Sequence, residues 1–281
     1  MKFVAGGVRG TTPITHRSYE AYGGDTTSYL VQGDKGDQVV VDLGTGVKNL
    51  MGYFNHDAGN QEVTVVITHF HLDHLIGLVT LPNLEKSKTN VTVAARVHGE
   101  FEIESVVDNL IKPPYWPLDI RSMSKGVKFE NLADTHEGTP RRIGDLAMRW
   151  CPQSHPGGST AYRFDELSTG KSVLVATDIE WQKSTDEMRE SFLALCADPG
   201  PLDLLVMDGQ FQASEYHQRE GWGHSTWSDV IEVGKASGAK QVLITHHSPE
   251  NDDARLDELS ASLKESGLMI RLARQGDVIN M

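Results

Sequence analysis

The stretch "THFHLDH" (68–74) places three histidines and one aspartate within six positions, directly after a β-branched run typical of a buried strand. His69 and His71 are two residues apart, so in an extended chain their side chains point to the same side. Asp73 and His74 follow at the turn. Imidazole and carboxylate groups suit zinc-like cations. The spacing therefore predicts that His69 and His71 hold one ion, while Asp73 and His74 reach a second.

This cluster does not close two coordination shells, so further ligands must come from elsewhere in the chain. "SHPGGSTAYRF" offers His155 beside glycines that let backbone approach a ligand closely. "VLVATDIEW" offers Asp178 at a strand end, where a carboxylate could bridge two cations. "VLITHHSP" offers His246 at another strand end. The candidate metal ligands are therefore seven in number: His69, His71, Asp73, His74, His155, Asp178 and His246.

Short β-branched runs and helix-like stretches alternate along the chain, which predicts an α/β fold. Four of the runs end in a residue that can bind metal or move a proton: His69, Asp178, Asp208 and His246. The carboxyl ends of strands are where open α/β sheets gather their sites. The expected strands cover 28–32, 38–43, 63–68, 91–95, 146–150, 172–178, 202–208 and 240–246, and the expected helices 72–81, 185–197, 225–237 and 253–266.

Composition narrows the class of protein. A chain of 281 residues with 38% hydrophobic content can bury a large core, as one sizeable α/β domain or two small ones, and we expect a single domain over 1–281. A net charge of −13 disfavours long nucleic acid as a partner. Two cysteines, no signal-peptide pattern and no long apolar segment favour a cytoplasmic protein with no membrane partner.

The segment 98–140 fits neither a regular strand nor a regular helix pattern. It contains "IKPPYWPLDI", whose prolines and aromatics suit an ordered loop. It is either a lid over a site or a surface insertion packed by its own aromatics. As a lid it would bring Phe101, Tyr115 and Trp116 to a position where they could stack a base.

The seven ligands resemble the signature of the metallo-β-lactamase superfamily of binuclear hydrolases, HxHxDH followed by a distant His, Asp and His. The resemblance implies an αββα sandwich, in which two mixed β-sheets lie back to back with helices outside. It also implies two divalent metal ions as cofactors, zinc or alternatively manganese. By this resemblance His69, His71 and His155 bind the first metal, Asp73, His74 and His246 the second, and Asp178 bridges them.

"EGWGHSTW" (220–227) contains a Gly-His-Ser-Thr segment similar to the HST motif of the superfamily's phosphodiesterase branch. That branch includes the RNase Z-type tRNA 3′-processing ribonucleases and the PhnP-like cyclic phosphodiesterases. The ribonucleases carry a His-Glu-Ala-Thr-Phe segment upstream, which aligns with "VMDGQF", so Asp208 matches their glutamate and Met207 their histidine. The resemblance implies a catalytic pair of Asp208 and His224. Alternatively His224 caps the following helix, a role for which Ser225 and Thr226 are better suited.

Phosphodiester hydrolysis needs a nucleophile, charge neutralisation and help for the leaving oxygen. Two metals supply the first two by lowering the pKa of a shared water and clamping phosphate oxygens. A histidine outside the metal shell, held by a carboxylate, can supply the third, which is the role expected of His224 with Asp208. Asp73 is expected to double as the base that orients the attacking hydroxide.

The leading hypothesis is hydrolysis of a small cyclic phosphodiester, such as a cyclic nucleotide or a ribosyl cyclic phosphate. An RNase Z-like nuclease is the first alternative, but the intervals around Asp178 are too short for a glycine-rich basic arm. A lactone or carboxyl-ester hydrolase is the second, and it would leave His224 and Asp208 unexplained. Family resemblance also suggests a homodimer. Arg9 and Thr26 are candidate substrate contacts.

Other residues carry no motif, and for them a packed or solvated side chain is the default expectation. Trp222 and Trp227 are expected to be core residues, with base stacking as the alternative. The histidines in this group are His16, His56, His98, His136, His217 and His247.

Overall fold

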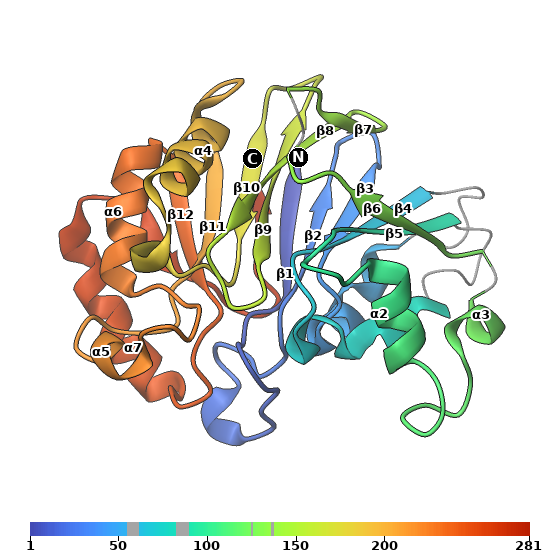
Figure 1. Cartoon of the computed structure of the whole chain (residues 1–281). Helices are drawn as coiled ribbons and strands as arrows, with labels where there is room; N and C mark the ends of the chain where they lie inside the picture. Colours follow the sequence, from blue (N-terminus) through green and yellow to red (C-terminus); the bar gives the residue numbers. More distant parts are fainter. Residues whose placement is uncertain (55–61, 83–89, 125, 136–137) are drawn as a thin grey trace.

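The computed structural model describes residues 1–54, 62–82, 90–124, 126–135 and 138–281. Within them two seven-stranded sheets pack face to face, and helices cover the outer face of each (Figure 1). The predicted αββα sandwich of two mixed sheets is confirmed. His56 and His136 lie outside the described residues.

The first sheet is antiparallel at one side and parallel at the other. Its strand order is β14 (Val278–Asn280), β1 (Lys2–Gly7), β2 (Ser28–Gln32), β3 (Gln38–Val41), β4 (Glu62–Ile67), β5 (Asn90–Arg96) and β6 (Lys128–Leu132). Neighbours from β14 to β3 pair antiparallel, and those from β3 to β6 pair parallel. Because parallel strands share a direction, the carboxyl ends of β3 and β4 meet at one edge.

The second sheet has the same mixed character. Its order is β13 (Ile270–Leu272), β12 (Gln241–Thr245), β11 (Leu204–Asp208), β10 (Ser172–Ala176), β9 (Ser159–Glu166), β8 (Leu146–Gln153) and β7 (Arg141–Ile143). Strands β10 to β13 pair parallel, whereas β7 to β10 pair antiparallel. The carboxyl ends of β10, β11 and β12 therefore also lie together.

Alternation along the strands builds three apolar layers. In β3, Val39 and Val41 point into the core between the sheets, whereas Val40 points outward to the helices. In β4, Val66 faces the inner core and Val65 the outer one. A strand buried on both faces needs apolar residues at nearly every position, which is why these runs show no polar alternation.

Two groups of helices complete the outer layers. Over the first sheet lie the 3₁₀ segment η2 (Thr45–Tyr53) and the helices α2 (Ile103–Leu110) and α3 (Ile120–Met123). Over the second sheet lie α4 (Asp186–Ala197), α6 (Trp227–Ser237) and α7 (Asp253–Ser262), with the short α5 (Tyr216–Arg219) nearby (Figure 1). None of the helices in the described ranges is long and apolar enough to cross a membrane.

The expected helix at 72–81 is wrong. The chain forms two short 3₁₀ turns there, η3 (Leu72–His74) and η4 (Ile76–Thr80). The backbone is instead tied to the loop after β3, because Leu43 donates to the His74 carbonyl at 2.9 Å and Gly77 donates to the Leu43 carbonyl at 2.6 Å. These bonds replace those that an α-helix would need. The other expected strands and helices are confirmed within a few residues.

The segment 98–140 contributes regular structure where its sequence predicts a loop. It forms α2 and α3, and its strand β6 is the edge of the first sheet. Trp116 is partly buried against the core under α2, and its Nε1 donates to the Met123 sulfur at 3.1 Å. Tyr115 is 77% exposed. Whether this segment closes over the site as a lid is not tested by the structure, and the lid stays a prediction.

Candidate metal centre

Strand ends position the site. His69 follows β4, while Asp178 and His246 follow β10 and β12 in the other sheet. Asp178 has φ 56° and His246 has φ 60°, the left-handed region that non-glycine residues rarely adopt. Backbone strain of this kind persists where the surrounding structure holds it, commonly at functional sites.

Three histidines form the first ligand group. The ring centroids are 4.5 to 4.8 Å apart for each pair among His69, His71 and His155. The His155 Nε2 atom is 3.0 Å from His71 Nδ1. With Asp178 they place four ligand atoms within 4.8 Å of one another. This is a donor set that suits a zinc-like cation.

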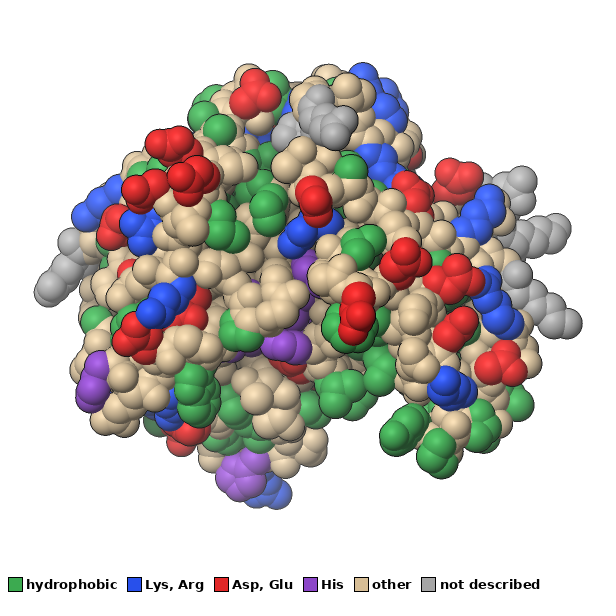
Figure 2. All heavy atoms as spheres, viewed as in Figure 1, with side chains coloured by type: hydrophobic (Ala, Val, Ile, Leu, Met, Phe, Trp, Pro, Cys, Tyr) green, Lys and Arg blue, Asp and Glu red, His purple; other side chains and the backbone are tan. Residues whose placement is uncertain are grey.

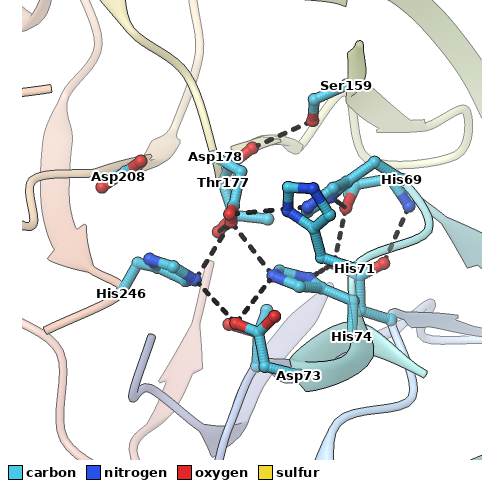
Figure 3. A network of polar contacts seen from close by, with 12 residues as sticks. His69, His71, Asp73, His74, Ser159, Thr177, Asp178, Asp208 and His246 are labelled. Atoms are coloured by element: carbon cyan, nitrogen blue, oxygen red, sulfur yellow. Dashed lines mark hydrogen bonds and ion pairs between the residues drawn. The ribbon is translucent and has the colours of Figure 1, made fainter. Parts of the chain in front are cut away.

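Asp73, His74 and His246 form the second ligand group, again within 4.8 Å. The Asp73 Oδ2 lies 3.3 Å from His74 Nε2 and 3.4 Å from His246 Nε2. Asp178 lies between the groups: its Oδ1 is 3.1 Å from both His74 Nε2 and His246 Nε2, whereas its Oδ2 faces His69 Nε2 at 3.6 Å (Figure 3). One carboxylate thus offers an oxygen to each group.

Further hydrogen bonds orient the ligands from behind. Asp42 is fully buried and accepts from His74 Nδ1 at 2.8 Å and from the Thr68 backbone N–H at 2.7 Å. The His155 Nδ1 lies 2.8 Å from the Gly223 carbonyl. Bonds of this kind fix which ring nitrogen is free to bind a metal. Sequence reasoning missed this role of Asp42, although it follows a β-branched run just as Asp178 does.

The ring nitrogens of the ligand histidines have the burial and bonding expected of metal ligands. Among the described residues, His69 Nε2, His74 Nε2 and both ring nitrogens of His246 are buried and have no hydrogen-bond partner. Burial lowers the pKa of His155 to about 4, and burial together with His74 lowers that of His69 well below its ordinary value. Both rings are therefore neutral near pH 7, the form that binds a cation. Burial opposes charge on His246, but Asp178 and Asp73 raise its pKa to about 8.

His224 lies beside the two ligand groups and belongs to neither, although with Asp178 and His246 it forms a third set of possible ligand atoms within 4.8 Å of one another. Its Nδ1 is 2.8 Å from Asp208 Oδ2 and 3.9 Å from Asp178 Oδ2, and its ring stacks on His246 with centroids 4.9 Å apart. Asp208 is buried at the end of β11. The alternative role of His224 as a helix cap is wrong, because Thr226 is the N-cap of α6 and forms a capping box with Asp229.

Glu180 anchors the loop that carries His224, and sequence reasoning missed it. Its buried carboxylate accepts from the backbone N–H groups of Gly221 at 2.7 Å and Gly223 at 2.8 Å, and from the Tyr216 hydroxyl at 2.7 Å. Gly223 has φ 92°, and a Cβ there would lie 2.2 Å from His155 Nδ1. Only glycine lets this loop approach the ligand so closely.

A cavity of about 560 Å³ opens onto both ligand groups and His224. In the space-filling view, histidine side chains are visible in a hollow near the middle of the face shown (Figure 2). Among the described residues that line the cavity, Arg219 is the single Arg or Lys; its guanidinium lies over the Phe211 and Trp222 rings and pairs with Glu250 at 2.7 Å.

The two residues expected as candidate substrate contacts, Arg9 and Thr26, bond to the protein's own backbone. Arg9 is fully buried and donates to the carbonyls of Gly23, Ser248 and Asn251. Thr26 is buried, and its hydroxyl donates to the Asp73 backbone carbonyl at 2.7 Å.

The two tryptophans differ in position. Trp227 is a core residue as expected, whereas Trp222 is 58% exposed and lines the cavity. Of the histidines without a motif, His98 and His247 are buried and packed, and His16 and His217 are on the surface.

The fold and the paired ligand groups together define the class of metal-dependent hydrolases. The chain matches the β-lactamase superfamily domain over residues 38–247, three quarters of its length, and it belongs to that superfamily. Membership implies a divalent metal cofactor.

The chain is similar to known ribonucleases and to a diphosphatase of the PhnP family. Ribonuclease BN of Cronobacter sakazakii is 25% identical over 240 residues, which are 74% of this chain and 77% of that protein. The structure of human tRNase Z, short form, aligns with a TM-score of 0.69 at 15% identity, covering 100% of this chain and 99% of that one. A diphosphatase from the PhnP family aligns with a TM-score of 0.69 at 18% identity, covering 99% and 96%. The predicted resemblance to this branch of the superfamily is confirmed.

Proposed function

We propose that the chain is a binuclear-metal-dependent phosphodiesterase that hydrolyses a small cyclic phosphodiester, such as a cyclic nucleotide or a ribosyl cyclic phosphate. One observation carries the proposal: His224 lines the same cavity as the metal ligands, and the buried Asp208 carboxylate holds its Nδ1 from behind at 2.8 Å. A metal centre alone serves many hydrolases, whereas a carboxylate-held histidine beside it suits a reaction that must also protonate a leaving oxygen.

In this proposal each group of ligand side chains would hold one metal ion. His69, His71 and His155 would hold one ion, and Asp73, His74 and His246 the other, with Asp178 shared between them. Two such ions would supply charge neutralisation at the phosphate oxygens and a water of lowered pKa. Zinc suits the five histidines, and manganese is the alternative.

Asp73, Asp208 and His224 would have separate roles beside the ions. Asp73 is fixed by the Thr11 backbone N–H, which donates to its Oδ2 at 2.8 Å, and in our proposal it also orients the attacking water. Asp208 accepts from His224 Nδ1, so that in the ring with both nitrogens protonated Nε2 is the atom that donates toward a phosphate or leaving oxygen.

The cavity volume and the net charge of the chain favour a small substrate. A volume of about 560 Å³ lies within the range of small-molecule sites, roughly 300 to 1,000 Å³. The net charge of −13 opposes binding of a long polyanion.

A nuclease acting on RNA is the second candidate, favoured by relatives that bear ribonuclease names. A lactone hydrolase is the third candidate, but lactone hydrolysis would leave the pair of His224 and Asp208 unexplained.

The test is a panel of substrates offered to the zinc- or manganese-loaded protein. It contains bis-p-nitrophenyl phosphate, cyclic nucleotides, a tRNA precursor and a lactone. We expect kcat/KM to be highest for a cyclic phosphodiester. Preference for the tRNA precursor would support the nuclease instead, and a lactone turned over faster than every phosphodiester would overturn the proposal.

A further inference from the structure

A second cavity adjoins the metal centre on the side of α2 and has no role in the proposal so far. Its volume is about 400 Å³. It shares His71 with the first cavity, so the two meet at the metal ligands. Its lining residues come from the loops after β4 and β5, from α2 and from the loop after His155: His69, Phe70, His71, His98, Phe101, Val106, Asn109, Leu110, Pro156, Gly157 and Gly158.

The walls of this second cavity are uncharged. None of the described residues that line it is Asp, Glu, Lys or Arg, whereas the first cavity includes Asp73, Arg219 and Glu250. His98 is buried and meets the Phe70 ring edge-on at 5.2 Å. Burial and the neighbouring Arg96 lower the pKa of His98 to about 4, so its ring is neutral near pH 7.

The floor of the second cavity is held at a fixed position relative to the metal ligands. The Gly158 N–H donates to the His155 carbonyl at 2.8 Å. Gly158 has φ 84°, and a Cβ there would lie 2.8 Å from His98 Nδ1, so a side chain at this position would be strained and crowded. The backbone turn therefore places the cavity directly beside His155.

We propose that the second cavity binds an uncharged aromatic or alkyl group of the substrate while the metal centre holds the phosphate. This inference rests on the proposed phosphodiesterase function and adds the chemical class of an organic group next to the phosphate. Burial of an apolar group against Phe101, Val106 and Leu110 is favourable. A charged group there would lose its hydration, and none of the described residues that line the cavity is a charged partner for it.

The experiment compares two diesters with the same charge and the same leaving group, phenyl 4-nitrophenyl phosphate and methyl 4-nitrophenyl phosphate. We expect kcat/KM to favour the phenyl diester by about tenfold, since a well-packed aromatic contact adds roughly this much. Phe101 is 56% exposed, so Phe101→Ala should fold and should reduce the phenyl-to-methyl ratio toward one. Val106→Trp, which fills the cavity from α2, should reduce it as well.

Tyr115→Ala is the matched control. It removes an exposed aromatic from the same segment that lines neither cavity, so the ratio should stay at its original value. Calorimetry with phenylphosphonate and methylphosphonate gives a readout without turnover, and the same preference should appear in the dissociation constants.

The outcomes separate the two claims. Turnover of both diesters with equal kcat/KM, unaltered by Phe101→Ala and Val106→Trp, would overturn the second cavity as a subsite and leave the phosphodiesterase function standing. No turnover of any phosphodiester by the metal-loaded protein would overturn the function and this inference together.

Discussion

His224 has an environment that fixes its ring in one orientation. The Asp208 carboxylate lies 2.8 Å from Nδ1, and the same carboxylate accepts from the backbone N–H groups of Ile179 and Gln210 at 3.2 and 3.0 Å. Burial raises the pKa of Asp208, while the adjacent His224 opposes that rise. The ring is thus held from one side and directed toward the cavity from the other.

His224→Ala should reduce kcat for a phosphodiester by about 10² to 10⁴-fold, since it removes the proposed proton donor. Metal content, measured by atomic emission, should stay at the wild-type value. His217→Ala, which removes an exposed histidine of α5 that lines neither cavity, should leave kcat within a few fold. Full activity of His224→Ala with full metal content would refute the role.

Asp42 acts through His74 and not through the substrate. It has φ 62°, a conformation that asparagine tolerates, so Asp42→Asn changes the charge without new backbone strain. We expect the metal dissociation constant to rise by about 10 to 100-fold, because the support of His74 weakens. Competition with a chromophoric chelator measures it.

The matched control for Asp42 is Asp203→Asn. Asp203 is also a buried carboxylate, but it precedes β11 at the end opposite Asp208 and pairs with Lys171 and Lys240. Its replacement should leave metal affinity unchanged. Equal losses in the two variants would mean that Asp42 matters for folding only.

At the scale of elements, the loop between α5 and α6 carries much of the site. It holds Trp222 and His224, and its Gly223 carbonyl meets His155. Two backbone N–H groups of this loop donate to Glu180, which follows Asp178 by two residues. The loop is therefore tied to the same strand end as the shared carboxylate.

Replacing Glu180 should release this loop. Glu180→Ala removes three hydrogen bonds to a carboxylate, two of them from backbone N–H groups of this loop. It should lower kcat by roughly tenfold or more, since each such bond contributes about 1.5 to 3 kcal/mol. Hydrogen exchange at the Gly221 and Gly223 amides should become faster. Glu180→Gln keeps one acceptor oxygen and should give intermediate values. Unaltered exchange in Glu180→Ala would contradict the anchoring role.

At the scale of the whole molecule, the site joins the two sheets. His69, His71, Asp73 and His74 come from the first sheet, whereas His155, Asp178 and His246 come from the second. A metal ion bound between them would link the two halves in the folded state only, and it would stabilise that state by mass action.

Zinc should therefore raise the melting temperature. At free zinc 100-fold above the dissociation constant, the gain is about 2.7 kcal/mol, which corresponds to a shift of roughly 5 to 10 °C. Differential scanning calorimetry with zinc and with chelator measures it. Asp178→Asn should reduce the shift, whereas Asp203→Asn should not. A shift of the same size in Asp178→Asn would show that the stabilising zinc binds elsewhere.

One hydrolase domain over 1–281, a cytoplasmic location and a homodimer are expectations that the fold neither requires nor opposes. Size-exclusion chromatography with light scattering would give the oligomeric state directly.

The superfamily, the α/β class and the seven candidate ligands could be predicted from the sequence, because ligand spacing and β-branched runs are local patterns that can be recognised without the tertiary structure. The sequence did not determine the 3₁₀ turns after His71, where bonds to Leu43 replace helical ones. Nor did it single out Asp42 and Glu180, since a carboxylate acquires such a role only when another strand or loop is folded against it. The tertiary structure alone decided that the second, uncharged cavity lies beside the ligands, because its walls come from α2, two strand-end loops and the turn after His155, which are distant in sequence.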